Sequence, residues 1–169
     1  MKFLSATFRN FGPFAEQALD LSAGNYGLHV IFGPNESGKS SALRGLRYFL
    51  FGFPGQAPDD FIFKYTQFRI HASLANTRGE ILECVRRKGN KDTLRATDDK
   101  AILSEDKLQS FVGGFNEEQF ELLFGLDLKL LEKGGELIAG GESNLGEALF
   151  AAGALSLIHI SEPTRQAEI

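Results

Sequence analysis

One short loop constrains this chain more than any other feature of its sequence. Residues 33–40 read Gly-Pro-Asn-Glu-Ser-Gly-Lys-Ser, a complete G-x-x-x-x-G-K-S motif. In such a loop the backbone N–H groups point inward as an anion nest, and the helix that follows adds the positive end of its dipole. Lys39 can then reach the β- and γ-phosphates of a nucleotide, while the Ser40 hydroxyl can hold the metal. The motif therefore predicts binding of ATP with Mg²⁺.

The sequence on both sides of the loop favours this interpretation over a chance glycine-rich turn. Residues 28–32 form a short, continuous apolar run, which is typical of a strand buried on both faces. Residues 42–50 carry apolar side chains at helical spacing. Strand, loop and helix thus follow in the order that a phosphate-binding loop requires. The residues expected around the phosphates are Gly33, Pro34, Asn35, Glu36, Ser37, Gly38, Lys39, Ser40 and Ser41.

Composition favours one globular domain and excludes several other classes. The chain has 169 residues, of which 43% are hydrophobic and 24% charged, so it can form a core. Its formal net charge of −4 gives no basic signature, and Arg86–Lys88 with Lys91 and Arg95 is the one local basic cluster. The single Cys84 excludes a disulfide framework. No signal peptide or membrane-spanning run is visible, which predicts a cytoplasmic protein without a membrane partner.

Alternating residues predict a series of strands. Residues 3–9 alternate at period two, and residues 18–21 offer a second strand, so the phosphate loop would follow the third. Residues 68–74 and 80–87 also alternate and flank a polar turn, which predicts an antiparallel hairpin. A brief strand is expected at residues 93–96. The expected fold is therefore α/β, with a mixed sheet, this hairpin and peripheral helices.

Capping residues predict two helices in the second half of the chain. Ser104 and Asn116 each precede acidic residues and an apolar pattern, as N-caps do. Four glycines between residues 134 and 141 predict a flexible loop, and residues 145–152 have a helical pattern. From Leu155 the chain resembles the translation of a sequencing adapter, so we expect residues 155–169 to be foreign to the protein. The alternative is a genuine apolar strand.

Three stretches resemble one protein family. The stretches Arg9–Phe14, Gly33–Ser41 and Leu145–Gly153 resemble the YhaN family, bacterial relatives of the Rad50 and SMC ATPases. The resemblance covers residues 1–154 and implies the amino-terminal lobe of an ABC-type or SMC-type P-loop ATPase head. In that family a carboxy-terminal lobe of the same chain, beyond a coiled coil, completes the head. Two heads then close around two nucleotides, which implies a head-to-head homodimer.

The resemblance also implies roles for three residues outside the loop. The stretch that contains Arg9 and Asn10 lies near the nucleotide in relatives, so a phosphate or base contact is implied; Arg9 is equally well explained as an ordinary charge at a strand end. Asp127 stands where Rad50 relatives carry a Gln that helps to hold magnesium. Asp127 could bind the metal, or it could instead cap a helix that begins at Leu128.

The catalytic parts of such a head would lie outside this chain. The family's signature loop, its apolar-run-Asp motif and its catalytic Glu belong to the second lobe, so no catalytic residue is assigned here. The resemblance implies DNA processing by the whole protein beside an Mre11-type nuclease. Two alternatives remain open: a complete small-molecule P-loop kinase, and a nucleotide-gated binding module without catalysis. The two strands expected before the loop count against the kinase.

Overall fold

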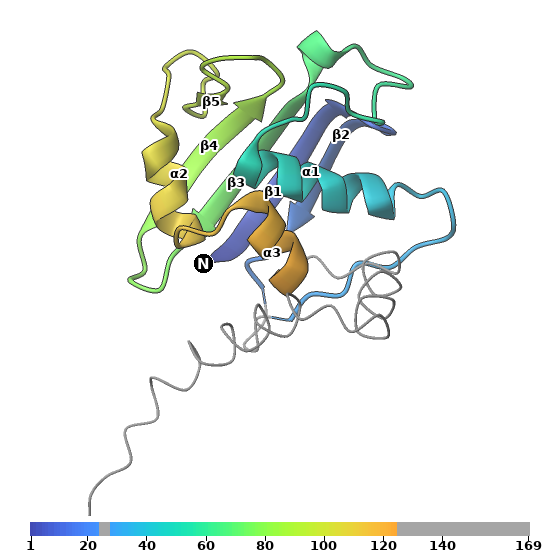
Figure 1. Ribbon diagram of the computed structural model, residues 1–169. Helices are drawn as coiled ribbons and strands as arrows, with labels where there is room; N and C mark the ends of the chain where they lie inside the picture. Colours follow the sequence, from blue (N-terminus) through green and yellow to red (C-terminus); the bar gives the residue numbers. More distant parts are fainter. Residues whose placement is uncertain (24–27, 125–169) are drawn as a thin grey trace, which may run out of the picture. The chain divides into compact units, whose positions relative to one another are not determined.

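The computed structural model describes residues 1–23 and 28–124, and the chain divides into two units, Met1–Phe115 and Asn116–Ile169. The first unit contains a five-stranded sheet in the order β2-β1-β3-β4-β5, with helix α1 across one face (Figure 1). Its elements are β1 (Lys2–Phe11), β2 (Phe14–Asp20), α1 (Lys39–Phe51), the 3-10 helix η1 (Tyr65–Gln67), β3 (Arg69–Ala75), β4 (Ile81–Arg87), β5 (Leu94–Arg95) and α2 (Glu105–Val112). The described part of the second unit contains α3 (Glu117–Phe124).

The predicted hairpin is confirmed as β3 and β4. These strands pair antiparallel from Arg69 opposite Arg87 to Ala75 opposite Ile81. Asn76 closes the turn between them, because its Oδ1 accepts hydrogen bonds from the backbone N–H groups of Arg78 and Glu80. A side chain that satisfies the backbone in this way is a strong turn former.

The predicted helix caps are confirmed as well. Ser104 Oγ accepts a hydrogen bond from the N–H of Asp106 at the start of α2, 3.2 Å away. Asn116 Oδ1 accepts one from the N–H of Gln119 at the start of α3, and Gln119 Oε1 accepts from the N–H of Asn116 in return. Each cap satisfies backbone donors that a helix leaves unpaired at its first turn.

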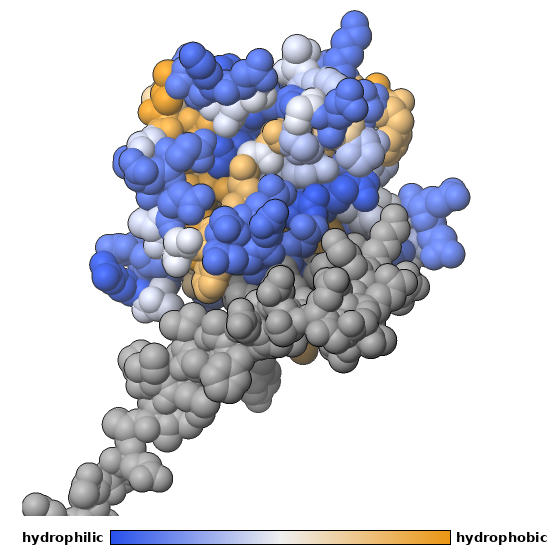
Figure 2. Space-filling view, viewed as in Figure 1, coloured by the Kyte–Doolittle hydropathy of each residue, from blue (hydrophilic) through white to orange (hydrophobic). Residues whose placement is uncertain are grey.

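Helix α1 packs on a row of inward-facing residues that crosses the sheet. Phe8, Ile70 and Arg86 stand opposite one another on β1, β3 and β4, and all three side chains are buried. Phe11 anchors an aromatic cluster beside them, with ring centroids 5.3 Å from Phe68 and 6.2 Å from Tyr48. Figure 2 shows hydrophilic residues over much of the visible face, with hydrophobic patches between them. Among the described helices, none is long and apolar enough to span a bilayer.

The predicted mixed sheet is wrong for the described residues, and so is the buried strand at residues 28–32. Every neighbouring pair in the sheet is antiparallel, and residues 28–34 have no regular structure. Leu28 is 81% exposed and Phe32 89% exposed. The physical reason is that an apolar run favours burial but does not specify a strand partner, and residues 28–32 pair with no strand of this sheet.

Several predictions fall on residues outside the described part. Asp127, the glycine-rich stretch 134–141 and the helical pattern 145–152 all lie there, as do residues 155–169. The domain boundary at residue 154 therefore stays a prediction.

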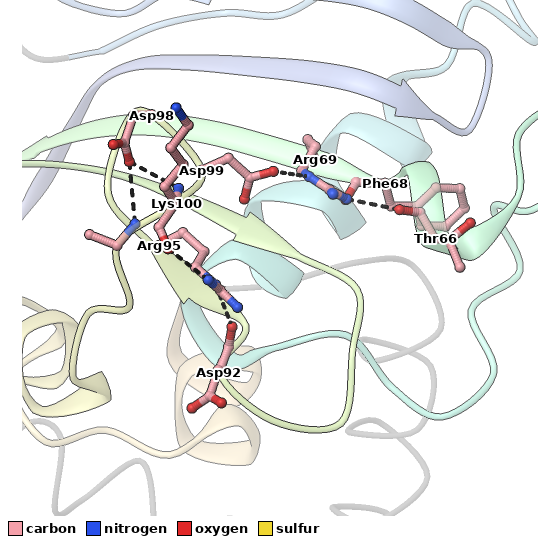
Figure 3. A network of polar contacts seen from close by, with 9 residues as sticks. Thr66, Phe68, Arg69, Asp92, Arg95, Asp98, Asp99 and Lys100 are labelled. Carbon is pink, nitrogen blue, oxygen red and sulfur yellow. Dashed lines mark hydrogen bonds and ion pairs between the residues drawn. The ribbon is translucent and has the colours of Figure 1, made fainter.

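A polar network holds the segment after β5 against β3 (Figure 3). Arg69 Nε donates to Asp99 Oδ2 at 2.6 Å, which links the first residue of β3 to the turn after β5. Asp98 Oδ1 accepts from the N–H of Lys100, and Arg95 Nη1 donates to the Lys100 carbonyl. These bonds fix the turn that returns the chain from β5 toward α2.

Arg86 is the main polar group of the interior. Its side chain is 1% exposed, and its Nε donates to the carbonyl of Phe49 in the last turn of α1 at 3.0 Å. Its guanidinium also pairs with both carboxylate oxygens of Glu105 at the start of α2. Because a helix leaves its last carbonyls unpaired, a cation at that place satisfies them and complements the dipole. Arg86 therefore ties β4, α1 and α2 together.

Arg86→Met is expected to lower the free energy of unfolding by about 2–4 kcal/mol, because it leaves the Phe49 carbonyl and the Glu105 carboxylate without their partner. Urea unfolding followed by circular dichroism measures the change. Arg87→Met is the matched control, since alternation along the strand turns Arg87 to the other face. Equal effects of the two substitutions would contradict the proposed role of Arg86.

The buried Cys84 thiol makes the stability of the folded chain fall at alkaline pH. The thiol is buried on β4, and burial raises its pKa to about 11. In the unfolded chain the thiol ionises near its ordinary value of about 8.5. As pH rises from that value toward 11, the unfolded state loses a proton that the folded state keeps, so stability falls.

Urea unfolding at pH 7.5, 9 and 10 is expected to show this decline in the wild type and a smaller decline in Cys84→Ala. The difference between the two proteins isolates the thiol from the lysines and tyrosines, which titrate in both. Parallel pH profiles would show that Cys84 ionises equally in the two states.

Candidate functional site

The loop from Gly33 to Gly38 makes a tight turn before helix α1. The N–H of Ser37 donates to the carbonyl of Pro34 at 3.4 Å. Within that turn Glu36 has a φ of 66°, and Gly38 follows with a φ of 90°. A positive φ is easy for glycine and costly for other L-residues. The motif's second glycine is therefore explained by its backbone angle, whereas Glu36 holds a strained conformation.

The first turn of α1 is left open for an anion. Its N-cap, Gly38, has no side chain to accept a hydrogen bond, and the first turn contains no acidic residue. In the same chain α2 and α3 both have side-chain caps and two acidic residues in the first turn. The unpaired N–H groups and positive dipole end of α1 thus face outward without a resident negative group. This is the arrangement that binds phosphate.

Lys39 already lies over the loop. Its Nζ donates to the carbonyls of Gly33 at 2.8 Å and Pro34 at 2.6 Å. An ammonium has three N–H donors, so these two bonds leave one for a ligand. The Ser40 side chain is exposed beside it and has no hydrogen bond within the described residues, which leaves its hydroxyl open to a metal ion.

A cavity of about 520 Å³ opens at this place. That volume falls in the range of about 300–1,000 Å³ that small-molecule sites occupy. Most of its lining belongs to the predicted loop, and two residues come from elsewhere in the chain. The lining residues are Pro13, Asn35, Glu36, Gly38, Lys39, Ser40, Ser41 and Phe61. Together with the open helix end, this cavity fits the phosphates and magnesium of a nucleotide.

The β1–β2 turn forms one wall of the site. A Cβ on Gly38 would lie 2.6 Å from the Phe14 ring and 2.7 Å from Pro13, so the loop reaches the turn only because residue 38 is glycine. Gly12 has a φ of 56°, and a Cβ there would lie 3.1 Å from Ser41. The phosphate loop is therefore packed directly against the side chains of Pro13 and Phe14 in this turn.

A buried ion pair forms the other support. Asp59 is fully buried, and both its carboxylate oxygens accept hydrogen bonds from Arg44 on α1, at 2.7 and 3.0 Å. Arg44 Nη2 also donates to Ser41 Oγ, and hydrogen bonding to Asp59 raises the pKa of Arg44. The Asp59 carbonyl accepts from the N–H of Gly12. One aspartate thus joins α1, the β1–β2 turn and the segment after α1.

Sequence reasoning did not find these supporting residues. Pro13, Asp59 and Phe61 lie outside the motif, and Arg44 is one polar residue within the helix expected after it. Only their place in three dimensions brings them to the loop. The acidic pair Asp59-Asp60 after Pro58 was the single local signal.

Arg9 and Asn10 do not line the cavity in the described part of the chain. Arg9 Nη2 instead pairs with Glu16 Oε1 across the β1–β2 ladder at 2.6 Å, with both side chains about half exposed. Asn10 has a φ of 50° at the end of β1. Their predicted nucleotide contact stays a prediction, as does the metal role of Asp127, which lies outside the described residues. Among the described residues no cluster of three His, Cys, Asp or Glu could hold a metal by itself.

A second, apolar cavity of about 260 Å³ also borders the loop. Its walls include Phe8, Phe14 and Leu19 from the β1–β2 hairpin and the exposed Ile31 and Phe32. The apolar run before the loop therefore borders an incompletely filled apolar space.

Comparisons with known proteins bear on this site. Residues 1–166 match the AAA domain family, whose members are P-loop ATPase-like domains. A search of curated proteins finds no match. The family match supports nucleotide binding at the loop.

Glu36→Gly is expected to stabilise the chain by about 0.5–1 kcal/mol, because it removes the positive-φ penalty of a non-glycine residue. Thermal and urea unfolding measure the change. Glu36→Gln keeps the backbone penalty but removes the charge, so we expect its stability to match the wild type. A stabilisation by Gln as large as that by Gly would assign the effect to charge rather than to the backbone.

Proposed function

Because the chain belongs to the AAA domain family, we propose that its phosphate loop binds ATP together with Mg²⁺. The observation that carries the proposal is the open first turn of α1, with the Lys39 ammonium beside it. Backbone N–H groups, a helix dipole and one flexible cation converge on one cavity, and none of them is neutralised by a cap. A triphosphate has the charge and size that this arrangement binds.

Each loop residue has a separate task in this proposal. The open backbone amides at the start of α1 hold phosphate oxygens, Lys39 donates its remaining N–H, and the Ser40 hydroxyl binds the metal. Magnesium, when bound with the nucleotide, neutralises charge on the β- and γ-phosphates. Arg44 and Asp59 act at a distance by keeping the start of α1 in position.

The chain is further proposed to be one lobe of a Rad50/SMC-like head of the YhaN type. The exposed apolar run at residues 28–32 and the apolar cavity beside it are what a strand supplied by a second lobe would cover. Apolar side chains as exposed as Leu28 and Phe32 gain free energy when such a partner buries them. The carboxy-terminal lobe of the same parent chain is the proposed partner, followed by a head-to-head homodimer.

DNA processing beside an Mre11-type nuclease is the proposed role of the whole protein, and it rests on the resemblance. The basic cluster from the end of β4 to β5 is a poor DNA contact. Arg86 is buried, Lys88 donates to the carbonyls of Pro54 and Gly55, and Arg95 binds the turn after β5. Any DNA contact is therefore proposed to lie elsewhere.

The two remaining alternatives make different demands on the site. A small-molecule kinase needs a second binding place for the phosphate acceptor. A nucleotide-gated module needs only the loop. Two strands, β1 and β2, precede the loop, an order that favours an ABC-type lobe over the kinase.

Isothermal titration is expected to show weak MgATP binding that Lys39→Ala weakens at least about tenfold, since hydrogen bonds to a charged group contribute about 1.5–3 kcal/mol. Lys107→Ala, an exposed lysine on α2, is the matched control and should bind as the wild type does. Unchanged affinity in Lys39→Ala would overturn ATP binding at this loop.

A phosphate-release assay on the same protein is expected to show no turnover, because the proposal places the catalytic base in the second lobe. Turnover at ordinary ATPase rates would contradict the half-head proposal. It would leave ATP binding itself intact.

A further inference from the structure

An aromatic ring that belongs to no known part of the site lines the phosphate cavity. Phe61 borders the same space as Lys39 and Ser40, yet it is 62% exposed. A phenylalanine so exposed loses the free energy that burial would supply. Pro13 contributes a second apolar surface to the same cavity. One part of the lining is thus suited to phosphate and another to a flat apolar ring.

The segment that carries Phe61 is anchored on both sides. Two residues before it, Asp59 is fully buried and bonded to Arg44 and to the N–H of Gly12. Four residues after it, Tyr65 Oη donates to the Ala57 carbonyl at 3.0 Å, and the Tyr65 ring contacts Phe68. The first anchor joins the segment to α1 and the β1–β2 turn, which hold the phosphate loop, and the second ties it back to Ala57 and to Phe68 of the aromatic cluster. The ring is therefore held next to the cavity before any ligand arrives.

We propose that Phe61 is the stacking platform for the nucleobase of the bound nucleotide, with Pro13 as a second apolar contact. This inference rests on the proposed function, because it takes the phosphates to be at Lys39. The cavity of about 520 Å³ has room for more than a phosphate chain. Base–aromatic stacking tolerates every base, because every base has a π-face. The ligand class is then a nucleoside triphosphate rather than an inorganic polyphosphate.

The test compares ATP with inorganic tripolyphosphate, which has the charges but no base. Phe61→Ala is expected to weaken ATP binding about 5- to 150-fold, the range that base stacking contributes. Its affinity for tripolyphosphate should equal that of the wild type. Phe61→Tyr retains the ring and should retain the ATP affinity. Ile62→Ala is the matched control, because Ile62 is similarly exposed at 58% but does not line the cavity.

A spectroscopic readout makes the test independent of affinity. The chain contains no tryptophan, so Phe61→Trp introduces a single indole fluorophore. ATP is expected to quench its fluorescence by stacking, whereas tripolyphosphate should not. Circular dichroism of each variant verifies that it is folded.

The outcomes separate the two proposals. If Phe61→Ala binds ATP as the wild type does, or loses ATP and tripolyphosphate equally, the stacking inference is overturned while nucleotide binding stands. If the wild type binds neither ligand, or if Lys39→Ala binds both unchanged, the proposed function fails and the inference falls with it.

Discussion

The phosphate loop has its position because glycines at the start and middle of helix α1 let two aromatic rings of the β1–β2 hairpin approach its backbone. A Cβ on Gly45 would lie 2.6 Å from the Phe8 ring, and the same is true of Gly38 against Phe14. Any larger residue would force the helix away from the sheet, and interiors packed at crystal density transmit such a shift to their neighbours. The helix start, and with it the anion site, would move as a consequence. Close packing of α1 against the hairpin is thus a requirement for phosphate binding.

Two arginines hold helix α1 by ion pairs and hydrogen bonds in the position that close packing gives it. Arg44 and Asp59 fix the beginning of α1. Arg86 fixes its end, because its guanidinium donates a hydrogen bond to the Phe49 carbonyl and complements the negative end of the helix dipole. Both arginines are paired with a carboxylate from a segment distant in sequence, so each also orders a loop or a second helix. Helix α1 is therefore held at both ends, while its N–H groups remain unpaired at the one place where a ligand is expected.

Local patterns predicted the parts of this fold that local physics determines. The hairpin β3–β4, the caps at Ser104 and Asn116 and the helix after the loop all follow from alternation, turn chemistry and helical periodicity, which act over a few residues. The supporting residues Asp59 and Phe61 could not be predicted, because a contact across 15 or more positions leaves no local pattern. The strand expected at residues 28–32 failed for a related reason. Its apolar pattern reports a need for burial but not which segment supplies the neighbour.

The apolar run before the loop has a practical consequence for handling the protein. Leu28, Val30 and Phe32 are each at least 75% exposed, in a backbone stretch without ladder hydrogen bonds. Such a stretch can pair with another copy of itself as readily as with its intended neighbour, as unprotected strand edges do. Solubility on purification will thus decline with rising concentration and with kosmotropic salts, which strengthen apolar association. Low protein concentration and sulfate-free buffers are the conditions that suit this chain.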